Sequence, residues 1–123
     1  MKVLLYTASN INTNSLNIVN DILILMVRKY RIVDDLINTM LFISKLATYI
    51  IDNSQQRIQL TLIDVKSHVK KLYNEGIISN NDYDKINELL SKIENEKVKK
   101  EEKLNIVSQI HEILFNTFIK LIQ

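Results

Sequence analysis

The chain has 123 residues, a formal net charge of +2, one glycine, no proline and no cysteine. The missing cysteines exclude disulfide scaffolds and cysteine-ligated metal sites, and a single glycine excludes the Gly-rich phosphate loops of nucleotide-binding proteins. All-β folds are disfavoured because their turn residues are missing, and the 46% of hydrophobic residues argues against disorder. We therefore predict a single all-α domain over residues 1–123, a bundle of four to five helices with short loops.

Residues 1–14 form an N-terminal extension whose structure the sequence leaves open, with a short apolar stretch followed by a polar run. Residues 15–51 then carry apolar side chains at intervals of three and four, which predicts helix with a buried stripe. The stripe consists of Leu16, Val19, Leu23, Met26, Tyr30, Val33, Ile37 and Met40. It is unusually wide, and a helix that is apolar on most sides lies either at the centre of a core or in an interface.

The segment 15–51 contains no glycine or proline, so it can form one long helix or two. Two helices are favoured by its charges. The basic residues at 28–31 suit a helix C-terminus, and Asp34 and Asp35 suit a helix N-terminus, because each complements the helix dipole. We expect the break near residues 30–33.

The next helix is predicted over 54–75. Its apolar residues repeat with the alternating spacing of a buried helix face. These are Ile58, Leu62, Val65, Val69 and Leu72. The preceding Asp52-Asn53-Ser54 marks a boundary and supplies an N-cap.

A sharp corner follows this helix. Gly76 suits the left-handed position that terminates helices. Ser79 and Asp82 have the spacing of a capping box, with Ile78 and Tyr83 placed for the accompanying apolar contact. We therefore predict a second helix over 79–97, packed as a hairpin against 54–75. It buries Tyr83, Ile86, Leu89, Leu90 and Ile93.

The hairpin carries a resemblance. The string Leu72-Tyr73-Asn74-Glu75-Gly76-Ile77-Ile78-Ser79, followed by Asp82-Tyr83, Ile86 and Leu89-Leu90, resembles SHOCT-type helical hairpins. The resemblance covers about twenty residues within 69–93, in the middle of the chain rather than at its C-terminus. It implies a small oligomerisation or binding hairpin.

A mixed-charge run over 94–103 is expected to be a solvated helix end or linker. A last helix is predicted over 103–122, with Leu104, Val107, His111, Leu114, Phe118 and Leu121 on its buried side. Further apolar residues widen this side until it covers more than half of the helix. Like 15–51, this helix has more apolar surface than a small monomeric bundle needs.

The residue pattern supports no enzymatic site. Asp64 and His68 lie four residues apart on one helix face, but no nucleophile or third ligand accompanies them. His111 occupies a core-type position, and no zinc-protease or di-iron motif is present. We expect a protein that is not an enzyme, with no catalytic residues, no cofactor and no metal.

Nucleic acid is an alternative partner that is possible but not favoured. Residues 64–103 hold nine Lys and nine acidic residues, so their charges balance. The one basic cluster beside an aromatic residue consists of Lys66, Lys70 and Lys71, next to Tyr73. These lysines are the candidate contacts if the chain is a nucleic-acid-associated bundle serving a polymerase, nuclease or ribonucleoprotein.

The preferred interpretation is a non-enzymatic protein-interaction module that acts as an inhibitor or adaptor through apolar helix faces. Its partner is another protein or a second copy in a homodimer, and the candidate contacts are Leu25, Phe42, Ile110, Phe115 and Phe118. The abundance of Ile, Asn and Lys, whose codons are AT-rich, favours a viral or mobile-element accessory protein. No apolar run approaches the ~20 residues of a membrane span. We therefore expect a cytoplasmic protein without a membrane partner, located in the host-cell cytoplasm if it is viral.

Overall fold

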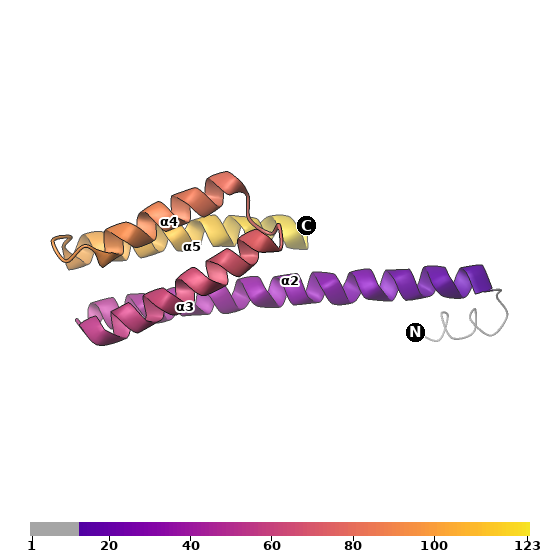
Figure 1. The fold of residues 1–123 in the computed structure, drawn as a ribbon, viewed down its shortest axis with the longest axis horizontal. Coiled ribbons are helices and arrows are strands. Elements are labelled where there is room, and N and C mark those ends of the chain that lie inside the picture. The colour runs from indigo at the N-terminus through magenta and orange to yellow at the C-terminus, as the bar shows by residue number, and fades with distance from the viewer. Residues whose placement is uncertain (1–12) are drawn as a thin grey trace. The chain divides into compact units, whose positions relative to one another are not determined.

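The computed structural model describes residues 13–123, and the predicted extension over 1–14 lies almost wholly outside this range. The described residues form four helices, which Figure 1 labels α2 to α5. Their bounds are α2 Thr13–Ile51, α3 Gln55–Asn74, α4 Asn80–Glu94 and α5 Lys100–Ile122. The prediction of an all-α bundle is confirmed.

Helix α2 continues through the predicted break, so the expectation of two helices is wrong. Charges near a helix end contribute about 0.3–1 kcal/mol each. A break would give up several backbone hydrogen bonds, and no glycine or proline favours one here. The contacts nevertheless divide the chain into two compact units at this place, residues 1–32 and residues 33–123. Both units share α2, and one domain over 1–123 stays a prediction.

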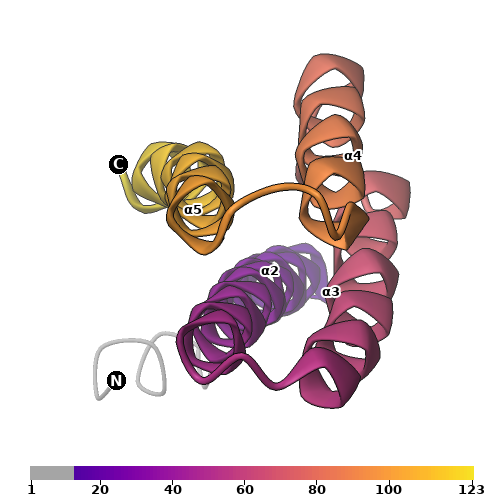
Figure 2. The ribbon, with the colours of Figure 1, turned by 90° about the vertical axis from the view of Figure 1, so that its left-hand side faces the viewer.

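The unit of residues 33–123 has a single apolar core to which all four helices contribute. Helix α4 packs against both α3 and α5 (Figure 2). The predicted stripe of α3 is buried as a whole, and four of the five side chains predicted on α4 are buried, whereas Tyr83 is half-buried. From α2 the core receives Leu36, Ile43, Leu46 and Ile50.

Helix α5 is rotated relative to the prediction. Its buried side chains are Lys103, Ile106, Val107, Ile110 and Leu114. Of the predicted stripe, Val107 and Leu114 are buried, while His111 and the remaining members are half-buried. Apolar residues cover so much of this helix that spacing alone does not locate the centre of the buried face. Packing within the core places that centre at Ile110 instead of His111.

The two corners around α3 use residues in the left-handed backbone region. Asn53 has a φ of 56° between α2 and α3, and Gly76 has a φ of 74° between α3 and α4. At the second corner the N–H of Ile77 donates to the carbonyl of Leu72 at 2.9 Å, as in the helix termination motif that glycine favours. The Ser79 hydroxyl then accepts from the Asp82 N–H at 3.1 Å. The predicted glycine corner and N-cap are confirmed.

Replacing Gly76 with alanine should lower the free energy of unfolding by about 1 kcal/mol, because a side chain disfavours the left-handed region. The substitution isolates the backbone effect, since a Cβ at this position would meet no atom within 4 Å. Urea denaturation measures the change. The control is Asn74→Ala at an exposed helical position, where little change is expected. Equal stability of Gly76→Ala and the wild type would contradict the conclusion that residue 76 adopts the left-handed backbone conformation.

Candidate protein-interaction surface

Eight of the exposed large apolar side chains of the described residues lie close together on α2, within residues 18–30, which we call the α2 apolar segment. Leu25 is 62% exposed and Tyr30 is 75% exposed. Between residues 17 and 31 only Val19 is half-buried, and no side chain is buried. The exposed large apolar residues are Ile18, Ile22, Leu23, Ile24, Leu25, Met26, Val27 and Tyr30. Isolated apolar residues are normal on protein surfaces, whereas contiguous groups of this size are typical of interaction sites.

Intrinsic helix propensity does little to hold this segment helical. Isoleucine, valine and asparagine, which recur between residues 13 and 32, are weaker helix formers than alanine or leucine. An isolated helix of this length is marginal in water, and helices in proteins gain most of their stability from packing an apolar face. The exposed face therefore favours binding to another surface.

The surface of the segment carries a shallow depression of about 320 Å³. It is lined by Leu23, Ile24 and Val27 together with Arg28 and Arg31. This combination of apolar floor and basic rim suits a partner that offers apolar and acidic side chains together. No helix in residues 13–123 combines the length and apolar character needed to cross a membrane.

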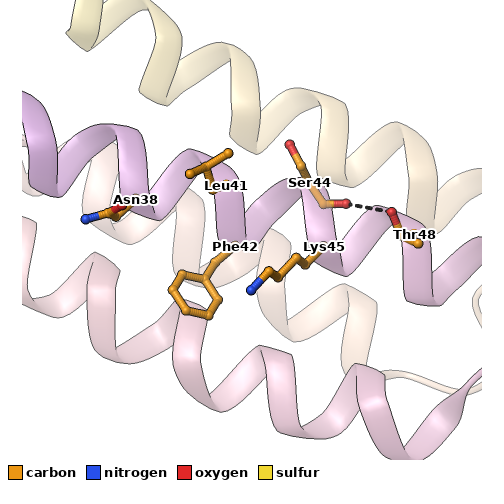
Figure 3. A pocket seen from close by; sticks show the side chains of 6 residues that line it. All are labelled: Asn38, Leu41, Phe42, Ser44, Lys45 and Thr48. Carbon is orange, nitrogen blue, oxygen red and sulfur yellow. Dashed lines mark hydrogen bonds between the residues drawn. The ribbon is translucent and has the colours of Figure 1, made fainter.

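Phe42, another predicted contact, lies further along α2 and is already packed within residues 33–123. Its ring stacks on His68 of α3 with a centroid distance of 4.6 Å, and the Lys45 ammonium lies 5.0 Å from its centroid. The ring borders an open depression formed by residues of α2 alone (Figure 3). Leu41 is the exposed apolar side chain of this depression. Phe42 is therefore only partly available to a partner.

The three predicted contacts on α5 differ in accessibility. Ile110 is fully buried in the core, so its assignment as a partner contact is wrong. Phe115 is 43% exposed, while Phe118 is half-buried against the core. Their ring centroids lie 6.3 Å apart, which makes them a small aromatic pair at the C-terminal end of α5.

The basic cluster predicted for nucleic acid is largely engaged within the fold. The Lys66 ammonium forms an ion pair with Glu94 of α4, and that of Lys71 lies 3.3 Å from a carboxylate oxygen of Asp35. Tyr73 stacks on Tyr83 at a centroid distance of 4.2 Å. Of the three lysines, Lys70 alone has no ion pair among the described residues. This arrangement provides neither a continuous basic groove nor a free stacking ring.

The two histidines each lie against an aromatic ring. His68 stacks on Phe42, and His111 lies 6.3 Å from Phe115, centroid to centroid. Within residues 13–123, no group of three or more His, Asp or Glu side chains is arranged to hold a metal ion. The geometry thus gives His68 and His111 a packing role.

Sequence reasoning missed Lys103, which it placed in a solvated charge run. This residue is only 6% exposed. It lines a small cavity of about 130 Å³ near the ends of α2 and α4 and the beginnings of α3 and α5. The spacing in the sequence could have indicated this burial. Lys103 precedes Ile106 by three residues and Ile110 by seven, so it lies on the same face of the helix as these two residues. At the rim of the cavity, the Lys100 ammonium donates to the Ile51 carbonyl at the end of α2.

Replacing Lys103 with methionine should raise the free energy of unfolding by about 1 kcal/mol, because a lysine that is only 6% exposed loses part of the hydration of its ammonium, whereas methionine has no charge to hydrate. No carboxylate or other side chain is hydrogen-bonded to this ammonium in the described part of the chain, and methionine keeps the packing of the stem. Thermal and urea denaturation measure the change, with exposed Lys99→Met as the control. A loss of stability specific to Lys103→Met would show that the ammonium has a stabilising partner.

Comparison of the chain with protein-family models, curated proteins and solved structures finds no match. The resemblance of residues 69–93 to SHOCT-type hairpins therefore stays a prediction. The hairpin's corner follows helix-termination chemistry, which is sufficient by itself to explain the shared residues.

Proposed function

We propose that this protein is a non-enzymatic protein-interaction module that binds a protein partner through the α2 apolar segment. The observation that carries the proposal is the exposure of eight large apolar side chains within thirteen consecutive residues. Monomeric proteins rarely leave such a group in contact with water. The same segment supplies Leu25, the predicted contact with the greatest exposure.

The apolar side chains of this surface can contribute a large part of the free energy that specific binding requires. Full burial of a large apolar side chain contributes about 1.5–3 kcal/mol, and these side chains are already about half-buried, so each has roughly 1 kcal/mol left to gain. Eight such residues would offset much of the translational and rotational cost of association. Arg28 and Arg31 at the edge of the depression add charge complementarity, which selects the partner more than it raises the affinity.

The remaining chemistry supports binding rather than catalysis. Each histidine packs on an aromatic ring, and two of the three clustered lysines, Lys66 and Lys71, pair with carboxylates of neighbouring helices. An inhibitor or adaptor role needs only the exposed apolar face. The AT-rich codon preference further supports a small viral or mobile-element accessory protein. The ion pairs of Lys66 and Lys71 argue against the alternative of a nucleic-acid-associated bundle, because they engage two of its three candidate contacts.

The proposal is tested by Leu25→Glu with Leu60→Glu as a matched control. Both are exposed leucines on helix surfaces, 62% and 58% exposed, but Leu60 lies on α3 outside the proposed surface. Burying an unpaired carboxylate costs roughly 3 kcal/mol, which corresponds to about a hundredfold weaker binding. Quantitative affinity capture from the native host should show that Leu25→Glu loses the main partner and that Leu60→Glu retains it.

Circular dichroism must show the same helix content for both variants and the wild type. Retention of every captured protein by Leu25→Glu, or equal losses with both variants, would overturn the proposed surface.

A further inference from the structure

We propose that the α2 apolar segment binds a second copy of itself, with the two helices antiparallel and related by a two-fold axis near Ile24. This inference rests on the proposed function, because it names the occupant of the same surface. Its independent support is the placement of two opposite charges, Asp21 and Arg28, beside the apolar stripe of a stretch of helix whose other polar residues are Asn20 and Lys29.

The two charges flank one apolar stripe of the segment. Ile18, Ile22 and Leu25 follow the alternating spacing of a helix-pairing face, and all three are exposed. Asp21 directly precedes Ile22, and Arg28 lies seven residues further on, so both charges lie along the same edge of this stripe. A separation of seven residues is about 10 Å along the helix, too far for the two to pair within one chain. Neither forms an ion pair among the described residues.

Antiparallel pairing brings these charges together across the interface. In that orientation the residue numbers of facing positions run in opposite directions, so Asp21 of each copy lies opposite Arg28 of the other. The two-fold axis produces this ion pair twice, and Ile22 of each copy faces Leu25 of the other. In an in-register parallel pair this edge of one copy faces the other edge of the second copy, so Asp21 would lie opposite Met26 and Arg28 opposite Val33, leaving both charges without an opposite partner. Charge complementarity therefore selects the antiparallel orientation.

The apolar side chains supply most of the affinity, and the ion pairs supply the orientation. The segment is about 20 Å long, which places the pair at the small end of protein interfaces. Small interfaces of this kind are typical of weak, reversible association. A self-association that is populated at tens to hundreds of micromolar is consequently expected rather than an obligate dimer.

Sedimentation equilibrium of the full chain measures its self-association and tests the proposal. The samples are the wild type, Asp21→Arg, Arg28→Asp and the double charge exchange Asp21→Arg/Arg28→Asp. Each single variant should dimerise at least tenfold more weakly, because each places like charges opposite one another. The double variant should return to within about threefold of the wild type. The control, Asp34→Arg, changes an exposed acidic residue of α2 outside the segment and should leave the dimer intact.

The two single variants separate pairing from net charge. Asp21→Arg raises the formal net charge by two, and Arg28→Asp lowers it by two. A general charge effect would therefore change their association in opposite directions, whereas loss of the ion pairs weakens both. If the double variant associates as weakly as the single variants, the antiparallel arrangement is overturned.

The absence of native cysteine allows a direct measurement of orientation. Spin labels at Asn17→Cys should be separated by about 20 Å along the helix axis in the antiparallel pair, because each label is seven residues from the two-fold axis. Moving the label to Asn20→Cys should shorten the measured distance, because the axial separation falls by about 9 Å. A distance that does not shorten would show a parallel pair and overturn the proposal.

A wild-type chain that remains monomeric at 1 mM would also overturn the proposal. In that case, loss of a captured host protein by Leu25→Glu but not by Leu60→Glu would still leave the proposed function standing, with a different protein as the occupant. Unchanged capture and no self-association would overturn both.

Discussion

The packing of residues 33–123 depends on two backbone reversals made by residues in the left-handed region. Asn53 turns the chain from α2 into α3, and Gly76 turns it from α3 into α4. Each reversal lets consecutive helices place their apolar faces on one core, so eighteen hydrophobic side chains are buried together. Since this region of backbone space is costly for most residues, asparagine and glycine at these corners make the helix boundaries sharp.

The same apolar composition has two different outcomes along α2. From Leu36 to Ile50, side chains on one face enter the core, whereas between residues 17 and 31 every side chain except Val19 is exposed. The backbone remains helical in both parts, so secondary structure alone does not distinguish them. What differs is the presence of neighbouring helices. This difference is the physical basis for the proposed interaction surface, and it also explains why the division between the units falls within a continuous helix.

The ion pairs contribute to the functional interpretation as well as to packing. The Lys66–Glu94 and Lys71–Asp35 pairs connect α3 to α4 and α2 to α3, respectively. The exposed Lys66–Glu94 pair contributes little stability, about 0–1 kcal/mol, whereas the Asp35 carboxylate of the second pair is mostly buried. Both pairs nevertheless reduce the local positive potential that a nucleic-acid contact would require. Asp21 and Arg28 have no such partners among the described residues, and this contrast makes them available to determine an orientation across an interface.

Much of the fold could be predicted from local chemistry in the sequence. The α3 stripe from Ile58 to Leu72, the Gly76 corner and the Ser79 cap were all predictable, because hydrophobic periodicity, backbone preference and N-terminal capping act over a few residues. Leu25 was predicted as a contact because a wide apolar stripe indicates either a core or an interface. Periodicity could not choose between these two outcomes, since both require the same side chains.

Tertiary structure decided the features that depend on neighbours far along the chain. On α5, whose apolar residues cover most of its circumference, it buried Ile110 and left Phe115 exposed. It also buried Lys103, although this residue belongs to a run of charged residues. Local sequence determined where this chain is helical and where it turns, because those preferences are properties of short segments. Which apolar faces are covered depended on the spatial arrangement of the helices, because burial is a property of the surrounding structure and not of the residue alone.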